Sequence, residues 1–451
     1  MFRKIAFCVL SIGFIAVCSA DTPPWKWLFN GNDLSGWHQK NGEAVYEVSD
    51  GAIVGKTVRN TPNSFLCTNN TYSDFILRLK FKVDSKLNSG VQIRSRSLAD
   101  YRNYRVHGYQ VEIDPSSRAW TGGIYDEARR GWLHPLSHGE PAAKAFKQNE
   151  WNEFRIEAIG STFKTWLNGK PAVHLEDDMT KEGFIGLQVH SIGNDKGKEG
   201  IKVMWKDIQI ITDNPEKYSK PISLPKRDLH NKLTSNEERA GWELLFDGKS
   251  TDKWRGAKLD RFPDFGWYVH DGILTIKESG GGEAANAGDI VTKKQYKDFE
   301  LRVDFKITPG ANSGIKYYVD TEINKGPGSS IGLEYQILDD KRHPDAKKGN
   351  HVGSRTLASL YDLIMAVNKH PNPMGDWNHA RIVSKDNHIQ HWLNGRKVLE
   401  YERRTPKFRK LVQESKYVKW DNFGELPKGN ILLQDHGNRV SFRNIKIREL
   451  K

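Results

Sequence analysis

The strongest constraint on this chain of 451 residues is that the same sequence pattern occurs in it twice. Trp-Leu-Asn-Gly at residues 166–169 returns at residues 392–395, and Asn-Ser-Gly at 88–90 returns at 312–314. These and further matches follow one order at nearly one spacing, which chance rarely produces. A chain of this length suits two domains of about 200 residues each. The pattern therefore predicts two copies of one domain in tandem.

Each copy consists of short alternating segments separated by turns. In residues 75–82 apolar residues alternate with charged ones, and this period of two is typical of a strand with one buried face. The Asn-Gly pair that ends Trp-Leu-Asn-Gly favours a tight hairpin turn. Many such strands in one domain predict an all-β fold, and we expect two tandem jelly-roll β-sandwich domains.

The domain boundaries follow from the repeat and from a polar stretch between the copies. Residues 212–239 contain three prolines and indicate a linker, in which Thr-Ser-Asn-Glu at 234–237 predicts the capping box of one short helix. The second copy also contains an insertion, residues 401–428. The expected organisation is a leader at 1–20, a first sandwich at 21–211, the linker at 212–239 and a second sandwich at 240–451.

Residues 1–20 have the composition of a secretory signal peptide. Two basic residues precede an apolar run too short to span a bilayer, and the segment ends in small residues. We expect cleavage after Ala20 and a periplasmic or secreted protein. A lipoprotein anchor on Cys18 is disfavoured because the bulky Val17 precedes it. No later segment approaches about 18 apolar residues, so we expect no stable membrane insertion.

Charge and cysteine content exclude some functional classes. The formal net charge is +13, but the basic residues are spread along both halves without a long basic run or a nucleic-acid-binding motif. We therefore expect no nucleic-acid partner and interpret the charge as a basic, solvated surface. Once the leader is removed, Cys67 has no second cysteine with which to pair, and a small buried side chain is favoured over a nucleophile.

One strand of the first copy has an unusual polar face. Residues 108–114 alternate so that Gln110, Glu112 and Asp114 point to one side. A strand with one buried face usually shows lysine, threonine or serine to solvent, whereas this one shows two carboxylates and an amide. The second copy repeats the design at residues 332–339, with glutamate and glutamine exchanged. We interpret the two strands as the floors of two sugar-sized clefts.

A glutamine–histidine pair recurs late in each copy. Gln188 and His190 lie two residues apart on a predicted strand and so share a face, as do Gln434 and His436. A single histidine on a strand is usually structural, but this pair accompanies an acidic strand in both copies. Histidine titrates near neutral pH and burial can raise a carboxyl pKa toward the same range, so the two types would form an acid–base pair.

Aromatic and basic residues follow the first acidic strand. Tyr125 and Trp132 lie near turns, where they would either stack on the C–H face of a sugar or cover the sandwich edge. Arg129 is either surface charge or a ligand for substrate oxygens. Scattered histidines of the second copy lack the spacing of metal ligands, and there is no phosphate loop, nucleophile elbow or dinucleotide fingerprint. We expect no cofactor, and a divalent metal is left open.

These motifs resemble a family of exported bacterial proteins associated with the hydrolysis of 3-keto-disaccharides. The resemblance covers residues 25–211 and 240–450, and it rests on LFNG…SGW, LFDG…W, NSG, GYQVEID, GLEYQILDD, TGGIYDEARRGW, SLYDL, WLNG, LQVH and LQDHG. It implies a concanavalin-like jelly roll and 3-keto-glucoside 1,2-lyase and 3-keto-2-hydroxyglucal hydratase activity. It also implies a small carbohydrate or glycoside as the substrate.

The implied reaction needs one acid–base pair and a hydrogen-bond donor for an enolate oxygen. With the strand phases, it predicts Glu112 and His190 as catalytic in the first copy and Glu334 and His436 in the second. The predicted substrate-binding residues are Gln92, Arg94, Gln110, Asp114, Tyr125, Arg129, Trp132 and Gln188 in the first copy, and Gln336, Asp339, Tyr361 and Gln434 in the second. No metal ligand is assigned.

The competing interpretations are a non-catalytic carbohydrate-binding protein and an ordinary glycoside hydrolase on the same sandwich. A structural adhesion module would instead present flat polar faces. The second copy has Tyr318 where the first has Arg94, so the two sites could differ in substrate or in reaction step.

Overall fold

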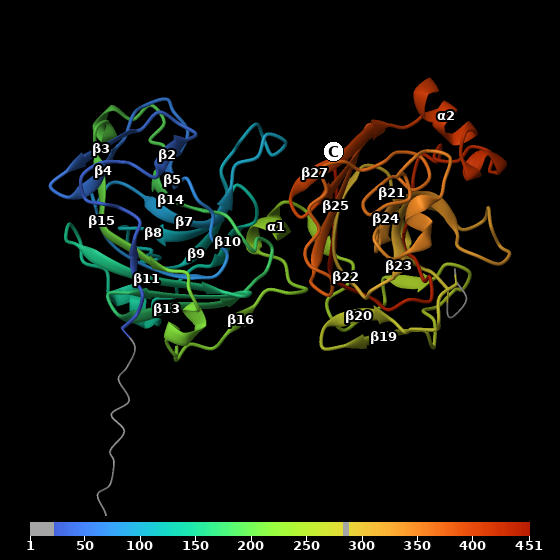
Figure 1. Ribbon diagram of the computed structural model, residues 1–451, viewed down its shortest axis with the longest axis horizontal. Helices are drawn as coiled ribbons and strands as arrows, with labels where there is room; N and C mark the ends of the chain where they lie inside the picture. Colours follow the sequence, from blue (N-terminus) through green and yellow to red (C-terminus); the bar gives the residue numbers. More distant parts are fainter. Residues whose placement is uncertain (1–21, 283–287) are drawn as a thin grey trace, which may run out of the picture.

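The computed structural model describes residues 22–282 and 288–451, which form two β-sandwiches joined by a linker (Figure 1). The predicted leader, residues 1–20, lies outside the described residues. In the described part of the chain, no helix is long and apolar enough to cross a membrane. The predicted all-β fold of two tandem jelly-roll sandwiches is confirmed.

The first sandwich contains two mainly antiparallel sheets. The larger has the order β16 (Arg227–Asp228), β13 (Lys170–Glu176), β12 (Thr162–Leu167), β11 (Asn152–Ile159), β6 (Phe75–Val83), β15 (Lys202–Ile211), β4 (Ala52–Lys56) and β3 (Val45–Ser49), with β1 (Lys26–Trp27) paired to β15. The smaller has the order β10 (Gly131–His134), β9 (Ile124–Glu127), β8 (His107–Ile113), β7 (Ser89–Arg96), β14 (Phe184–Val189), β5 (Ser64–Thr68) and β2 (Trp37–Lys40).

The second sandwich repeats this plan. Its larger sheet has the order β19 (Trp267–His270), β20 (Ile273–Ile276), β29 (Val440–Glu449), β22 (Phe299–Ile307), β25 (Asn378–Lys385), β26 (His388–Leu393) and β27 (Arg396–Glu402), with β17 (Trp242–Leu244) paired to β29. Its smaller sheet has the order β18 (Trp254–Gly256), β21 (Ile290–Tyr296), β28 (Gly429–Leu433), β23 (Asn312–Asp320) and β24 (Ile331–Leu338).

Helices lie in the connections between strands. Within residues 22–282 and 288–451, the two α-helices are α1 (Ser235–Arg239) in the linker and α2 (Pro406–Gln413) in the insertion of the second copy. Short 3-10 helices are η1 (Pro141–Lys144), η2 (Lys196–Lys198), η3 (Pro215–Tyr218), η4 (Pro344–Lys347) and η5 (Lys416–Lys419).

The alternation of each strand places the hydrophobic core between the two sheets. Leu77, Leu79 and Phe81 of β6 are buried in one cluster with Val111 and Ile113 of β8. A corresponding cluster fills the second sandwich. Because side chains alternate along a strand, the polar residues of β8 face away from this core, on the outer side of the smaller sheet.

The linker packs against both sandwiches. Its strand β16 pairs in parallel with β13 of the first sandwich. At the start of α1, Thr234 and Glu237 form a capping box. The Thr234 hydroxyl donates to the carbonyl oxygen of Arg130 at 2.9 Å, and Lys446 Nζ of the second sandwich donates to Glu237 at 2.5 Å. Helix α1 therefore joins the two domains through hydrogen bonds to each.

Candidate functional site

A chain of amide and carboxyl side chains lies on the outer face of the smaller sheet of the first sandwich. Strands β7 and β8 pair so that Gln92 faces Gln110 and Gly90 faces Glu112. Gln92 Nε2 donates to Gln110 Oε1 at 2.6 Å, and Gln110 Nε2 donates to Glu112 Oε2 at 2.9 Å. Asn88 Nδ2, which the sequence interpretation missed, donates to Glu112 Oε1 at 2.5 Å. The bonds fix the position of the Glu112 carboxyl group.

This polar face is buried, in contrast to the open cleft expected from the sequence. Glu112 is 4% exposed, and Gln92 and Gln188 are 0% and 1% exposed. The loop between β7 and β8 contributes to the covering, because Val106 packs in a buried cluster with Phe65. Phe65 is the cross-strand partner of Gln188 and therefore shares its face. The alternation of polar and apolar residues along β8 could not predict that residues of other segments bury this face.

Burial sets the protonation behaviour of Glu112. It raises the pKa of the Glu112 carboxyl to about 7, although hydrogen bonds from Asn88 and Gln110 favour the ionised form. The neighbouring Asp114 adds a smaller upward contribution to this pKa. A carboxyl group whose pKa lies near the working pH can both accept and give a proton. Glu112 is therefore suited to general acid–base chemistry near neutral pH.

The raised pKa of Glu112 also predicts how stability depends on pH. Below its ordinary value of 4.5 the carboxyl is protonated in both folded and unfolded chains, whereas above about 7 it is ionised in both. Between these limits the folded state binds more protons, so this group lowers stability as pH rises. Raising the pH from 4 to 8 is therefore expected to lower the free energy of unfolding of the wild type by about 3 kcal/mol relative to that of Glu112→Gln, whose side chain does not titrate.

Urea denaturation of the first sandwich at a series of pH values, followed by tryptophan fluorescence, measures this difference. If the free energy of unfolding changed with pH in the same way for Glu112→Gln and the wild type, the folded chain would not hold the Glu112 carboxyl in its neutral form.

The glutamine of the predicted Gln-x-His pair lies on the same face as Glu112. Gln188 of β14 pairs with Gly90 of β7, which in turn pairs with Glu112 of β8. Two strand spacings of about 4.8 Å each separate their backbones. A Cβ atom on Gly90 would lie 2.4 Å from Gln110 Cδ, so glycine leaves the space that the amide of Gln110 occupies.

His190 follows the end of β14 and is partly exposed, with Nδ1 2.7 Å from the carbonyl oxygen of Ser191.

The side chain of Gln188 is unusual because its polar atoms are unused. Both Nε2 and Oε1 are buried without a hydrogen-bond partner among the described residues. A buried amide without partners is costly, and such groups in native proteins often indicate a bound molecule. Gln188 thus offers one donor and one acceptor next to the Glu112 network.

Aromatic residues form one border of this face. Tyr125 of β9 is the cross-strand partner of Gln110, and Trp132 of β10 is the partner of Tyr125. The Tyr125 and Trp132 rings meet edge to face with centroids 5.2 Å apart. Asp114 follows Glu112 by two residues, but Arg118 Nε binds its carboxylate at 3.0 Å. Asp114 therefore acts on Glu112 mainly through its charge.

The structure places Arg94 outside the predicted site. The register of β7 shifts after Ile93, and Arg94 adopts a left-handed φ of 44°. Its fully buried guanidinium donates to the carbonyl oxygens of Ser73 and Gly160 at 2.6 and 2.7 Å, and to Asp74 at 2.8 Å. The irregularity breaks the alternation on which the prediction depended, so Arg94 supports the loops rather than a ligand beside Glu112.

Arg129 also lies away from the Glu112 face. It forms an ion pair of 2.6 Å with Asp126, and its Nη1 donates to Thr180. Its guanidinium lies 5.2 Å from the centre of the Tyr109 ring, and Tyr109 points to the opposite face of β8 from Gln110. Arg129 instead lines a cavity between the two sandwiches.

The corresponding face of the second sandwich has different chemistry. Strands β23 and β24 pair Lys316 with Glu334 and Gly314 with Gln336. Lys316 Nζ lies 3.7 Å from Glu334 Oε2, whereas the equivalent positions of the first copy contain two amides. Gln336 Nε2 donates to Asn312 Oδ1 at 3.3 Å. Sequence interpretation missed Lys316, although its position two residues after Gly314 puts it on the polar face.

The predicted glutamine–histidine strand of the second copy also borders this face. The backbone nitrogen of Gln434 donates to the carbonyl oxygen of Gly314 at 2.9 Å, which places the residue next to β23. His436 lies beyond the end of β28, with its ring 5.9 Å from the ring of His343. His436 Nδ1 is buried without a hydrogen-bond partner among the described residues.

Two further predicted residues of the second copy are held by loop contacts. The backbone nitrogen of Tyr361 donates to the carbonyl oxygen of Glu334 at 3.0 Å, and its hydroxyl donates to Asp345 at 2.7 Å. Tyr361 therefore lies beside the polar strand, with its hydroxyl already engaged. Asp339 accepts from Arg342 at 3.0 Å and from the backbone nitrogen of Gly310 at 2.8 Å. Its carboxylate thus stabilises a turn at the strand end.

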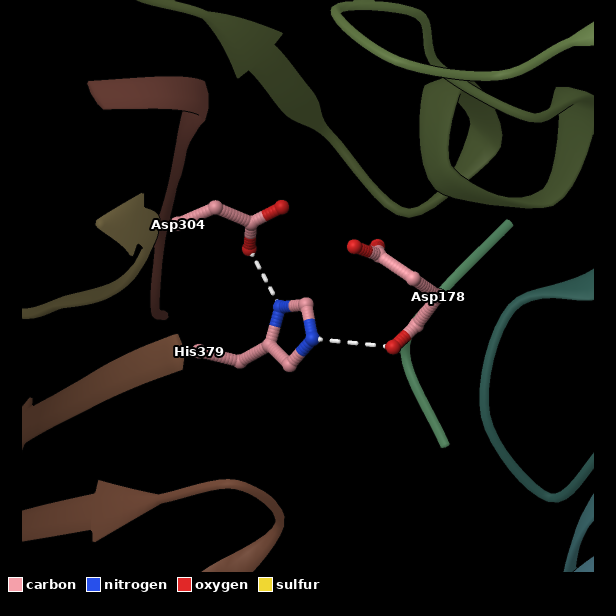
Figure 2. A group of neighbouring side chains, drawn as sticks. All are labelled: Asp178, Asp304 and His379. Carbon is pink, nitrogen blue, oxygen red and sulfur yellow. Dashed lines mark hydrogen bonds and ion pairs between the residues drawn. The ribbon is translucent and has the colours of Figure 1, made fainter. Parts of the chain in front are cut away.

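A third charged cluster joins the two sandwiches. Asp178 of the first domain meets Asp304 and His379 of the second, with possible ligand atoms within 4.8 Å of one another. Figure 2 shows His379 between Asp304 and the main-chain oxygen of Asp178, at 2.6 and 3.1 Å. Arg443 also binds the Asp178 carboxylate, at 2.6 Å.

Charge decides what this cluster can bind. Burial disfavours the His379 cation, but Asp304 outweighs burial and raises the pKa of His379 to about 9. The protonated imidazole and the Arg443 guanidinium neutralise the two carboxylates. A histidine must be neutral to bind a metal, so we interpret the cluster as an ion-pair contact between domains.

Comparison with known proteins places the chain in a family. The family described as 3-keto-alpha-glucoside-1,2-lyase-like domain matches it twice, at residues 24–211 and 241–448. A 3-keto-disaccharide hydrolase of Bacteroides thetaiotaomicron is 37% identical over 253 residues, covering 52% of this chain and 86% of that protein. Two solved structures from Parabacteroides distasonis, provisionally named glycosyl hydrolases, are each 30% identical. They cover 49% and 46% of this chain and 100% and 99% of their own, with TM-scores of 0.43 and 0.35. The chain therefore belongs to the 3-keto-alpha-glucoside-1,2-lyase-like family and contains two copies of its domain in tandem.

Proposed function

We propose that this chain is an exported enzyme that cleaves 3-keto-glucosides, either disaccharides or other glycosides, by elimination and water addition. The observation that supports it most is Glu112, a carboxyl group with a pKa of about 7 that accepts hydrogen bonds from the amides of Asn88 and Gln110. The family and the Bacteroides relative carry names for this class of reaction. Export rests on the leader at residues 1–20, and N-terminal sequencing of exported protein should begin at Asp21.

The chemistry follows from the ketone at C3 of the sugar. The ketone acidifies the C2–H bond, and a base removes that proton to form an enolate with its charge on O3. The enolate re-forms the ketone and creates a C1=C2 double bond as the C1 aglycone leaves with a proton from an acid. Water then adds a hydroxyl to C1 and a proton to C2, and the net result is hydrolysis.

Residues of the first copy fit these requirements. Glu112 would transfer the proton, and His190 at the partly exposed end of β14 would serve as its acid–base partner. The free donor of Gln188 would bind a substrate oxygen such as the developing enolate. Because Glu112 is only 4% exposed, binding requires the side chains that cover it to move aside.

The second copy supports a different step or substrate. The Lys316 ammonium lies 3.7 Å from Glu334 in an ion pair, whereas Glu112 has amide partners. We therefore assign proton transfer to the first copy and regard the second as an ion-paired variant of the same site.

The ordinary glycoside hydrolase has less support. It needs two carboxyl groups that flank the scissile bond, about 5 to 9.5 Å apart. In the first copy, the polar neighbours of Glu112 are amides, and Asp114 is bound by Arg118. A non-catalytic carbohydrate-binding protein would use the same amides without turnover, so an assay must separate it from the enzyme.

The test is to incubate purified mature protein with glucosides and with their 3-keto derivatives. The proposal expects aglycone release and a transient enone absorbance from the keto substrates alone, reduced in both Glu112→Gln and His190→Ala. Turnover of the unoxidised glucosides alone would identify an ordinary glycosidase. Saturable binding of either substrate without turnover would identify a binding protein.

A further inference from the structure

A cavity of about 410 Å³ lies between the two sandwiches, apart from both polar sheet faces. The first domain contributes residues near the start of β8, including Arg96 and Arg102, and the second contributes the turn at Asn394 and Lys397. None of the four predicted catalytic residues lines it. Its volume is in the range of small-molecule binding sites.

The charge of this interdomain cavity is unbalanced. Among the described residues that line it, ten are lysine or arginine and six are aspartate or glutamate. Several of the cations share a carboxylate, as where the single carboxylate of Glu300 binds Arg302, Arg381 and Arg448 at 3.0, 2.6 and 2.6 Å, and this group keeps a net positive charge. Other cations that line the cavity add to this positive excess, because they have no carboxylate partner among the described residues.

Arg96 and Arg102 are two such cations. Arg96 donates to the carbonyl oxygens of Glu182 and Asn394 at 3.3 and 3.0 Å, and Arg102 lies 5.7 Å from the centre of the Tyr101 ring. Neither forms an ion pair with a carboxylate of the described residues. Burial and the nearby Arg129 and Arg396 lower the pKa of Arg96 to about 10, although the charge of Glu182 acts in the opposite direction.

We propose that the interdomain cavity binds a small molecule that carries a carboxylate or phosphate group, held by Arg96 and Arg102. Guanidinium groups match the planar or tetrahedral oxygens of such anions and form charge-assisted hydrogen bonds with them. The carbonyl oxygen of Asn394, in the second domain, accepts from Arg96, and Asn394 also lines the cavity, so the anion would bind where the two domains meet. A ligand that bridges them would stabilise the folded chain. This site is separate from the proposed catalytic face and does not depend on it.

Isothermal titration calorimetry on the mature full chain tests this site, with inorganic phosphate, glucuronate and glucose at matched ionic strength. We expect saturable binding of phosphate or glucuronate and none of glucose, and the anion that binds identifies the ligand class. Arg96→Gln and Arg102→Gln should each weaken binding about tenfold. Arg59→Gln, which removes a surface partner of Glu199, should leave binding unchanged.

Thermal unfolding without ligand shows whether each variant folds, and the exposed Arg102 makes its variant the safer of the two. Binding of glucose alone, no saturable binding of either anion, or equal binding in the wild type and Arg102→Gln would overturn the proposal. Turnover of 3-keto substrates is expected to remain normal in both variants. Failure here would therefore leave the proposed function unaffected.

Discussion

Replacing Glu112 by glutamine is expected to lower kcat/KM for a 3-keto-glucoside by about 10²- to 10⁴-fold, the usual contribution of a positioned acid–base group. Glutamine has nearly the same shape and keeps one oxygen that can accept from Asn88 or Gln110, although its amide nitrogen cannot accept the second of these hydrogen bonds. It cannot exchange a proton, and the loss should therefore fall on kcat more than on KM. Steady-state kinetics across pH 5 to 9 would measure both parameters.

The matched control is Glu157→Gln. Glu157 is also buried, at 1% exposure, but it lies on β11 of the larger sheet, where Arg155 binds it at 2.8 Å. Its loss should reduce stability and leave turnover near the wild-type level. If Glu112→Gln retained wild-type kcat, or if both variants lost activity equally, the carboxyl of Glu112 would not be the proton-transfer group.

Replacing Arg130 by methionine is expected to destabilise the first sandwich by about 3 to 5 kcal/mol, the cost of leaving buried charges uncompensated. Arg130 Nε binds Asp126 at 2.7 Å, while Nη1 and Nη2 bind Asp177 at 2.7 and 2.9 Å. Asp177 follows β13 of the larger sheet and Asp126 belongs to β9 of the smaller one, so the guanidinium joins the two sheets. The midpoint of thermal unfolding should fall by about 10 °C.

The stability that Arg130 contributes should decrease at low pH. Arg130 holds the pKa of Asp177 well below its ordinary value of 3.8, although burial acts in the opposite direction. The stability that the pair contributes is therefore fully present above this value and is lost as pH falls below it. Differential scanning calorimetry at pH 7 and pH 3 would compare the variant with Lys80→Met, which removes an exposed ion pair with Asp207. The control should change stability by less than about 1 kcal/mol, and an equal effect of both variants would contradict the role of Arg130.

The repeat and the strand alternation predicted most of the fold. Two copies and an all-β architecture both follow from local periodicity. The acidic strand and the glutamine strand share one sheet but do not pair, because β7 lies between β8 and β14 and β23 lies between β24 and β28. Gln110 and Glu112 do point away from the core that Val111 and Ile113 enter. Such predictions succeed because side-chain direction along a regular strand depends only on position.

Three features of the candidate site depended on contacts distant in sequence. A register shift in β7 turns Arg94 away from the expected face. The alternation of residues in the sequence predicts side-chain directions only for a regular strand, so it could not predict this shift. The cross-strand neighbour of Glu334 proved to be Lys316, because pairing register is a property of two strands together. Arg129 turned toward the second domain, whose position no local pattern specifies.

The amino-acid sequence alone thus determined that the chain is a duplicated β-sandwich and which residues share each strand face. Only the tertiary structure decided that the Glu112 face is buried, and that burial raises its pKa to about 7. The physical reason is that strand direction is a local property of the backbone. Solvent exposure and electrostatic environment are instead sums over loops and strands that meet only in the folded chain.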